Sequence, residues 1–459
     1  MISTTETIAA ISTAMTNSGI GIVRISGDEA VSIIKKIFRP FKEKDIEEAG
    51  TFTVHYGSIV DGETVLDEVL VLIMRAPHTY TREDTVEIDC HGGIFVIRKI
   101  LELVLRSGAR PAEPGEFTKR AFLNGRIDLS QAEAVIDLIN AENDYALKSA
   151  VTQLKGSVSA RIRDLRSTLL EKIAYIEAAL DDPEHIEMEG FGEELLPVVE
   201  DSRRQIEELI ETADNGRIMK EGIKTVIVGK PNVGKSSLLN ALLGFNRAIV
   251  TDIAGTTRDT LEESISLGDI SLNIIDTAGI RDTEDVIEKI GVDKAREVAM
   301  DADLIVFLLD SSKPLDEDDR QIMEMIKGRK AIVLINKTDL PRQADTEGLL
   351  EGLGCPVIET SITENVGIDE FVKAVKEMFY NGEIDFNNQV FITNARQKAA
   401  LYSASESLKR TADSIENELS EDFYTIDMMD AYESLGQVIG EAIEDDLADE
   451  IFSKFCMGK

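Results

Sequence analysis

The chain has 459 residues and a formal net charge of −37, so we expect two to four soluble domains with an acidic, solvated surface. A protein that holds nucleic acid over a broad basic face is excluded, and any contact with RNA must be confined to a patch or left to a partner. Three scattered cysteines exclude a disulfide framework, and no apolar run reaches the 18 residues of a membrane span. With neither a secretion signal nor a transit peptide at the N-terminus, the sequence predicts a cytoplasmic protein.

The first half of the chain predicts two kinds of structure in turn. Residues 1–118 mix short β-rich runs, such as 20–25 and 69–74, with glycine and proline breaks, which indicates a small α+β domain. From about 120 to 215 glycine and proline are rare and helical periodicity takes over. Ser130 and Glu133 are expected to form a capping box at the start of one of these helices.

Residues 221–380 alternate apolar strands with amphipathic helices, the pattern of a parallel sheet covered on both faces. The expected strands are 226–228, 273–275, 304–309, 332–335 and 357–358. After about residue 385 the chain returns to helix, with one apolar stripe from Leu435 to Phe455. We therefore predict a multidomain α/β plus α fold with an N-terminal α+β domain (1–118), a discontinuous helical domain (119–215 and 381–459) and an inserted Ras-like P-loop domain (216–380).

The segment Gly229 to Ser236 reads GKPNVGKS and matches the phosphate-binding loop G-x-x-x-x-G-K-[ST]. A strand precedes it and a helix follows, as this motif requires. Its backbone N–H groups and the helix dipole would hold phosphates, Lys235 would add a cation, and the Ser236 hydroxyl would ligate Mg²⁺. The loop therefore predicts a nucleotide site.

Three further signals arrive in the order that a GTP site needs. The loop 251–259 (TDIAGTTRD) can cover the γ-phosphate, Asp276 to Gly279 (DTAG) follows a strand, and Asn336 to Asp339 (NKTD) follows another. Asp339 can accept two hydrogen bonds from guanine that adenine does not offer, and Ser361 fits the last base-contacting loop. The residues assigned to GTP are Asn232, Val233, Gly234, Lys235, Ser236, Ser237, Thr251, Asp252, Ile253, Ala254, Gly255, Thr256, Thr257, Asp276, Thr277, Ala278, Gly279, Asn336, Lys337, Thr338, Asp339 and Ser361.

Ile280 stands where small signalling GTPases carry the glutamine that orients the attacking water. An aliphatic side chain cannot do this. A carboxylate in the following segment, 281–291, is the nearest candidate.

Motifs along the whole chain resemble one family. They are 21–27 (GIVRISG), 91–93 (HGG), 114–117 (PGEF), 121–124 (AFLN), 128–134 (DLSQAEA), the 251–259 loop and the tail 449–459, which ends in FCMGK. The chain thus resembles the MnmE (TrmE) family of tRNA-modification GTPases.

The resemblance implies an N-terminal domain that forms a homodimer and binds a tetrahydrofolate derivative of the 5-formyl or methylene type. It also implies an FAD-dependent MnmG-like partner in a heterotetramer, and tRNA wobble uridine (U34) as the group modified at C5. Carried over by position, the folate contacts are Arg24, Glu87, Arg126 and Lys459. The K⁺ ligands are Asn232, Thr251, Ile253 and Thr256, those of Mg²⁺ are Ser236 and Thr257, and Glu288 orients the water.

Several alternatives stay open at this point. Without the family resemblance, Arg24 and Arg126 would be interpreted as solvated surface cations, and Glu288 would be interpreted as an exposed charge on a helix. Cys456 is either a buried cysteine at a helix end or a thiol close to the folate chemistry. A ribosome-assembly RNA-binding GTPase, or a GTPase scaffold whose partner does the chemistry, would share the nucleotide motifs.

Overall fold

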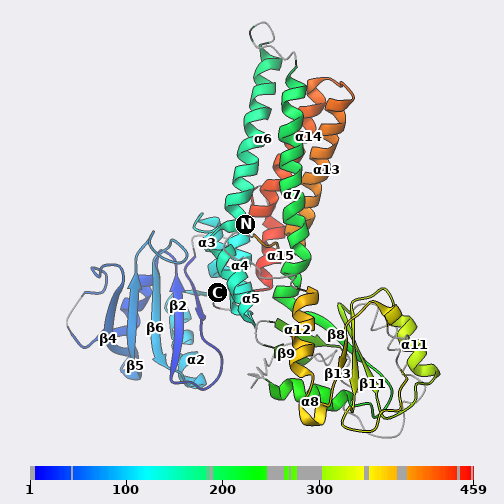
Figure 1. Cartoon of the computed structure of the whole chain (residues 1–459). Helices are drawn as coiled ribbons and strands as arrows, with labels where there is room; N and C mark the ends of the chain where they lie inside the picture. Colours follow the sequence, from blue (N-terminus) through cyan, green and yellow to red (C-terminus); the bar gives the residue numbers. More distant parts are fainter. Residues whose placement is uncertain are drawn as a thin grey trace. The chain divides into compact units, whose positions relative to one another are not determined.

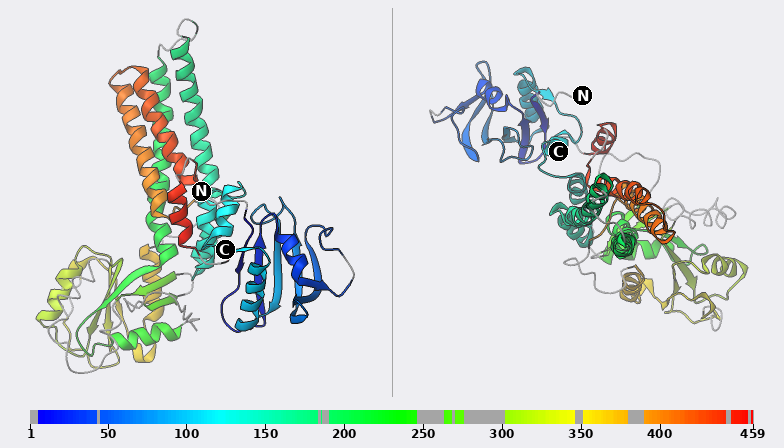
Figure 2. Two further views of the ribbon diagram at one scale, coloured as in Figure 1. Left: turned by 180° about the vertical axis from the view of Figure 1, so that it is seen from behind. Right: turned by 90° about the horizontal axis from the view of Figure 1, so that it is seen from above.

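The computed structural model describes residues 6–42, 45–182, 185, 190–245, 263–267, 270–275, 302–345, 351–379, 390–441, 445–455 and 458. The whole chain is drawn in Figures 1 and 2. Its contacts divide it into two compact units. Unit 1 comprises residues 1–136, 159–175 and 432–459, and unit 2 comprises 137–158 and 176–431. These limits differ from those of the three predicted domains, whose boundaries stay a prediction. Among the described residues, no helix is long and apolar enough to cross a membrane.

Unit 1 contains a seven-stranded sheet of order β3-β4-β5-β6-β2-β1-β7, which is antiparallel except where β1 meets β7. Helices α1 (Ala30–Ile37) and α2 (Ile94–Arg106) pack against it through Ile33, Ile34, Ile97 and Ile100, within one buried cluster. Both expected strands are confirmed, inside β2 and β5. The strands are β1 (Ile8–Ile11), β2 (Ile20–Ser26), β3 (Phe38–Pro40), β4 (Thr53–Asp61), β5 (Thr64–Met74), β6 (Thr85–His91) and β7 (Arg110–Pro111).

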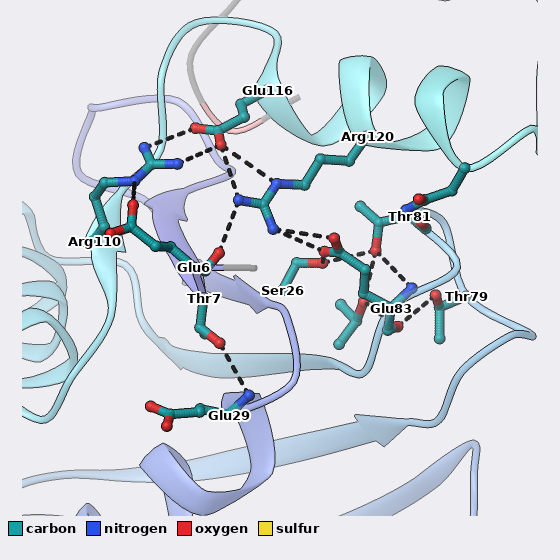
Figure 3. Close-up of polar contacts among 12 residues, drawn as sticks. Glu6, Thr7, Ser26, Glu29, Thr79, Thr81, Glu83, Arg110, Glu116 and Arg120 are labelled. Carbon is teal, nitrogen blue, oxygen red and sulfur yellow. Dashed lines mark hydrogen bonds and ion pairs between the residues drawn. The ribbon is translucent and has the colours of Figure 1, made fainter. Parts of the chain in front are cut away.

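A buried ion network joins helix α3 (Glu116–Leu123) to this sheet (Figure 3). The Arg120 guanidinium donates to Glu116 Oε1 at 3.0 Å, to both Glu83 oxygens at 3.1 Å and to the Glu6 carbonyl at 2.8 Å. Arg110 donates to the same Glu116 Oε1 at 2.6 Å and to Glu116 Oε2 at 3.0 Å. Burial by itself raises the pKa of Glu116, but Arg110, the Glu113 N–H and Arg120 outweigh it and hold that pKa below its ordinary value.

The predicted helical segments are present before and after the second sheet. They are α4 (Leu129–Ile139), α5 (Asp144–Leu154), α6 (Ser157–Asp181), α7 (Phe191–Glu221), α13 (Ala395–Glu416), α14 (Glu421–Ile439) and α15 (Asp445–Ser453). Within unit 2, α7 and α13 lie side by side along much of their length (Figures 1 and 2). Helices far apart in the sequence are thus neighbours in space.

One local prediction for these helices is wrong. The cap of α4 is formed by Asp128 and Gln131: the Asp128 carboxylate accepts the Gln131 N–H, and the Gln131 side chain accepts the Asp128 N–H, each at 3.1 Å. Asp128 precedes the first helical residue, whereas Ser130 is already inside the helix and donates to Asp128. The apolar stripe predicted from Leu435 to Phe455 is divided between α14 and α15, because α14 ends at Ile439 and the next residue, Gly440, has a left-handed φ of 87°.

Unit 2 contains a six-stranded sheet of order β13-β12-β11-β8-β10-β9, parallel except for the edge strand β9. Alternate strand residues belong to two buried clusters. One cluster includes Leu238 of α8 (Lys235–Phe245) and Phe371 of α12 (Ile368–Phe379). The other includes Ile322 of α11 (Glu317–Ile326). The predicted parallel sheet with two covered faces is confirmed. Its strands are β8 (Ile223–Val228), β9 (Glu263–Leu267), β10 (Ile270–Ile274), β11 (Leu304–Asp310), β12 (Ala331–Asn336) and β13 (Val357–Glu359), with short 3₁₀ turns η1 (Glu351–Leu353) and η2 (Ile362–Glu364).

Helix α7 leads directly into this sheet. It continues through the predicted boundary at residue 215 to Glu221, and β8 begins at Ile223. At Gly216 a Cβ atom would lie 2.1 Å from the Ile392 carbonyl oxygen, so the chain returning from the sheet packs against the helix that enters it.

Candidate functional site

The predicted phosphate-binding loop connects β8 to α8 and has the backbone that its glycines allow. Gly229 and Gly234 have φ values of 149° and 110°, and Asn232 is left-handed at 63°. A Cβ on Gly234 would lie 2.4 Å from Asn336 Nδ2, so only glycine lets the NKTD segment approach. The Lys235 ammonium donates to the Gly229 and Lys230 carbonyls at 2.6 and 3.1 Å, and burial lowers its pKa. The loop is therefore folded around a cation.

The NKTD segment lies directly beside this loop. Asn336 Nδ2 donates to the Val233 carbonyl, and Lys337 Nζ donates to the Asn232 carbonyl, both at 2.8 Å. Lys337 Nζ also forms an ion pair of 2.7 Å with Asp310, whose side chain is 1% exposed. Burial raises the pKa of Asp310, but Lys337 and Ser312 outweigh it and lower that pKa. Asp310 is a residue that the sequence analysis missed. Its place at the carboxyl end of a parallel strand, where such sheets bind ligands, was the available signal.

The assigned base-contacting residues are also close together. The Ser361 hydroxyl donates to Asp339 Oδ1 at 2.8 Å, and the Thr338 hydroxyl donates to the Thr360 carbonyl at 3.0 Å. These contacts fix the loop after β12 against the loop after β13. A carboxylate fixed in this way can accept the paired N–H groups of a guanine edge.

A second cluster of predicted residues lies in unit 1. Arg24 and Glu87 are directly opposite each other on β2 and β6 and form an ion pair of 2.7 Å. Arg24 Nη1 donates to the Gly458 carbonyl at 3.4 Å, and the Ser12 hydroxyl donates to the same oxygen at 3.1 Å. The side chain of Arg24 is only 18% exposed, so it is not a solvated surface cation. Gly458 thus lies beside the Arg24–Glu87 pair.

Two aromatic rings adjoin this cluster. The Arg24 guanidinium carbon lies 5.6 Å from the centre of the Phe117 ring, and that of Arg126 lies 4.6 Å from the centre of the Tyr80 ring. Tyr80 packs against the buried cluster that contains Phe117, so both rings belong to one region. Arg126 is exposed and lies over the Tyr80 ring. The sequence analysis did not find either ring, because single aromatic residues carry no motif.

The β6 strand adds an acidic residue that was also missed. Asp89 lies two residues after Glu87, and its Oδ1 atom is buried without a hydrogen-bond partner in the described part of the chain. Burial, followed by the charge of Glu87, raises the pKa of Asp89. The cluster therefore holds one carboxylate paired with an arginine and one carboxyl group whose pKa is raised.

Ser236 and Ser237 lie in the first turn of α8, and the other assigned residues not yet mentioned lie outside the described residues. These are the assignments on Thr251, Asp252, Ile253, Ala254, Gly255, Thr256, Thr257, Asp276, Thr277, Ala278, Gly279, Glu288, Cys456 and Lys459.

Comparison with known proteins identifies relatives along the whole chain. Residues 129–456 match the family model for the MnmE helical domain, and residues 7–126 match that for the GTP-binding protein TrmE N-terminus. A tRNA modification GTPase MnmE of Lachnoclostridium phytofermentans is 56% identical over 456 residues, 99% of this chain and 100% of the relative. Proteins of the same name from Geobacillus kaustophilus and Thermoanaerobacter pseudethanolicus are 49% and 50% identical, each over 99% of both chains.

Proposed function

Because this chain belongs to the MnmE family of tRNA modification GTPases, we propose that it hydrolyses GTP in the modification of C5 of the tRNA wobble uridine (U34). GTP hydrolysis in tRNA modification is the family's activity and that of this enzyme. The assignment of the nucleotide site is supported by one observation: Lys337 and Asn336 donate hydrogen bonds to carbonyls of the phosphate-binding loop. The relatives' shared name favours this function over a ribosome-assembly RNA-binding GTPase.

In the proposed GTP site, Lys235 and the backbone N–H groups of residues 232–237 would hold the phosphates, and Asp339 the base. Ser236 and Thr257 would hold Mg²⁺. Asn232, Thr251, Ile253 and Thr256 would hold K⁺. The group of Asn232 that the resemblance assigns to K⁺ is its side chain, and Lys337 contacts the main-chain carbonyl of the same residue. Both cations would offset the negative charge that develops on the γ-phosphoryl group.

Glu288 is the residue we assign to orienting the attacking water, since Ile280 cannot. Losing such a group is expected to lower turnover by about 100-fold or more. We therefore expect hydrolysis to be much faster in K⁺ than in Na⁺, and a Glu288→Ala protein to bind GTP normally while barely turning over. Equal rates in the two salts would remove the potassium assignment. Near-normal turnover by the variant would remove Glu288 from the mechanism.

A folate site in unit 1 is the second part of the proposal. Arg24, Glu87, Arg126 and Lys459 would bind a tetrahydrofolate derivative that supplies the one-carbon unit. What supports this is the approach of Gly458, the neighbour of Lys459, to the Arg24–Glu87 pair from the far end of the chain. Two arginines with adjoining aromatic rings suit a ligand that is both anionic and planar. Removal of residues 457–459 should abolish binding of formyl-tetrahydrofolate and leave GTP binding intact, as measured by calorimetry.

The proposed assembly is a homodimer that joins an FAD-dependent MnmG-like protein in a heterotetramer. A homodimer through the N-terminal domain is supported by an exposed apolar patch on β4 and β5. Val54, Tyr56 and Leu70 are 59%, 53% and 44% exposed, and Phe41 packs on Tyr56 with its ring centre at 4.8 Å. The family resemblance supports the partner, the heterotetramer and the cytoplasmic location. It also supports the division into domains 1–118, 119–215 with 381–459, and 216–380.

The test of the function is deletion of the gene, followed by mass spectrometry of wobble uridines in bulk tRNA. Loss of the C5 groups that returns on expression of the unaltered chain, and not of Glu288→Ala, is the expected result. Normal C5 groups with defective ribosomal subunits would favour the assembly factor instead. Full rescue by the Glu288→Ala protein would favour a scaffold whose partner does the chemistry.

A further inference from the structure

Lys230, the second residue of the phosphate-binding loop, does not extend into solvent. Its ammonium group lies 2.8 Å from Asp316 Oδ2 and 2.5 Å from Asp319 Oδ2, and its side chain is 16% exposed. Burial lowers the pKa of Lys230, but the two carboxylates outweigh burial and raise it, while Lys230 lowers the pKa of Asp316. Lys230 is therefore a cation bound to two anions.

These carboxylates lie at the start of helix α11. Asp316 and Asp319 form the reciprocal cap of α11: Asp319 N–H donates to Asp316 Oδ1 at 3.3 Å, and Asp316 N–H donates to Asp319 Oδ2 at 3.1 Å. The Asp319 side chain is 1% exposed, and Ile322 and Ile326 anchor the helix in the core. A partly buried lysine that forms ion pairs with two carboxylates of a helix cap is fixed far better than a lysine in an exposed ion pair.

The same loop is held from the other side two residues later. Lys337 Nζ contacts the Asn232 carbonyl and is itself fixed by Asp310. Between the two anchors the backbone passes through Pro231 and then through Asn232, a non-glycine residue with a φ of 63°. Such a conformation costs energy and persists only where neighbouring contacts impose it.

We propose that Lys230 is a positioning residue for GTP hydrolysis, which sets the orientation of Asn232 through its ion pairs with Asp316 and Asp319. The inference rests on the proposed function of Asn232 as a potassium ligand. Lys235 is held by the main-chain carbonyls of Gly229 and Lys230, and Asp339 by Ser361, so these two proposed GTP contacts do not use the Lys230 side chain. Loss of Lys230 should therefore lower turnover and the response to K⁺ more than it lowers GTP affinity. A misplaced group at a reacting centre lowers the rate by about 10- to 100-fold.

The experiment compares full-length Lys230→Met and Lys230→Arg proteins with a matched control, Lys327→Met. Lys327 follows the other end of α11, and its side chain is 58% exposed. GTP affinity is measured by calorimetry, and kcat is measured over a series of K⁺ concentrations at constant total salt, balanced with Na⁺. Lys230→Met should lose about tenfold in kcat and need several times more K⁺ for half-maximal rate, with GTP affinity changed less than threefold. Lys230→Arg should recover most of the loss, and Lys327→Met should behave like the unaltered protein.

A second variant guards against a local folding defect. Asp316→Asn keeps a side-chain oxygen that can cap α11 and removes the charge that Lys230 binds, so it should shift the K⁺ response in the same direction. Unchanged kcat and K⁺ response in Lys230→Met would overturn the inference, and so would a loss confined to GTP affinity, which indicates a direct phosphate contact. If the unaltered protein responds equally to K⁺ and Na⁺, the potassium assignment fails. A lower kcat in Lys230→Met at unchanged GTP affinity would then still retain Lys230 as a positioning residue, and an unchanged kcat would remove it.

Discussion

Replacement of Arg120 by methionine should destabilise unit 1 strongly. Arg120 is 3% exposed and lies between Glu116 and Glu83, which are 4% and 12% exposed. Methionine fills a similar volume and offers no donor. The change leaves Glu116 with Arg110 and the Glu113 N–H, and it leaves Glu83 with the Ser26 hydroxyl at 2.7 Å. The Glu6 carbonyl loses the guanidinium donor.

The size of the expected loss of stability follows from the carboxylate charge that loses its partner. Removing one member of a buried ion pair costs about 3–5 kcal/mol, because the remaining charge stays desolvated without compensation. Since Arg110 still neutralises Glu116, we expect the lower end, about 3 kcal/mol, or roughly a hundredfold rise in the population of opened molecules. Unfolding of a protein with several domains is not a two-state process, so the assay must be local.

Native-state hydrogen exchange read by mass spectrometry provides such an assay. Peptides from β2 and α3 should lose protection by this amount, while peptides from α13 in the other unit stay unchanged. The matched control is Arg106→Met, which removes a pair that is 63% and 43% exposed and should cost less than about 1 kcal/mol. Adding Glu83→Gln to Arg120→Met should restore part of the loss. If protection in Arg120→Met stays within about 1 kcal/mol of the unaltered protein, the network does not stabilise this unit.

Three further outcomes are expected. Asp339→Asn should weaken GTP and favour xanthosine triphosphate, whose C2 carbonyl accepts from an amide; unchanged GTP affinity in a titration would refute the assignment. Gly458→Ala should weaken formyl-tetrahydrofolate binding and leave GTP hydrolysis unchanged, because a Cβ there would lie 2.3 Å from the Ile11 carbonyl oxygen; undiminished folate binding would contradict it. Because the folded-state pKa of Glu116 is lowered, its contribution to stability is complete above its ordinary pKa of 4.5 and is lost as pH falls through the lower, folded value. Exchange protection of α3 should therefore fall as pH drops below about 4.5, and Glu116→Gln should flatten that dependence; an identical pH profile in the variant would argue against it.

The nucleotide site could be predicted from the sequence because its parts are local. Gly229 to Ser236 and Asn336 to Asp339 are short continuous segments whose backbone geometry and strand context specify their chemistry. The alternation of apolar strands and helices likewise predicted a parallel sheet with both faces covered, since each element's own periodicity decides which side is buried.

Other features depended on residues that only the folded chain brings together. Lys230 meets Asp316 86 positions later in the sequence, and Arg24 meets Gly458 after 434. No local sequence pattern predicts contacts at such sequence separations, because sheet topology and the start of a helix determine which residue becomes the partner. The helix cap shows the same limit at short range: Ser130 and Glu133 fit the capping pattern, yet Asp128 and Gln131 form the cap, since tertiary packing decided where α4 begins. Local sequence thus determined the chemistry and the elements, and tertiary structure decided which side chains hold them in place, because those contacts form only after the chain has folded.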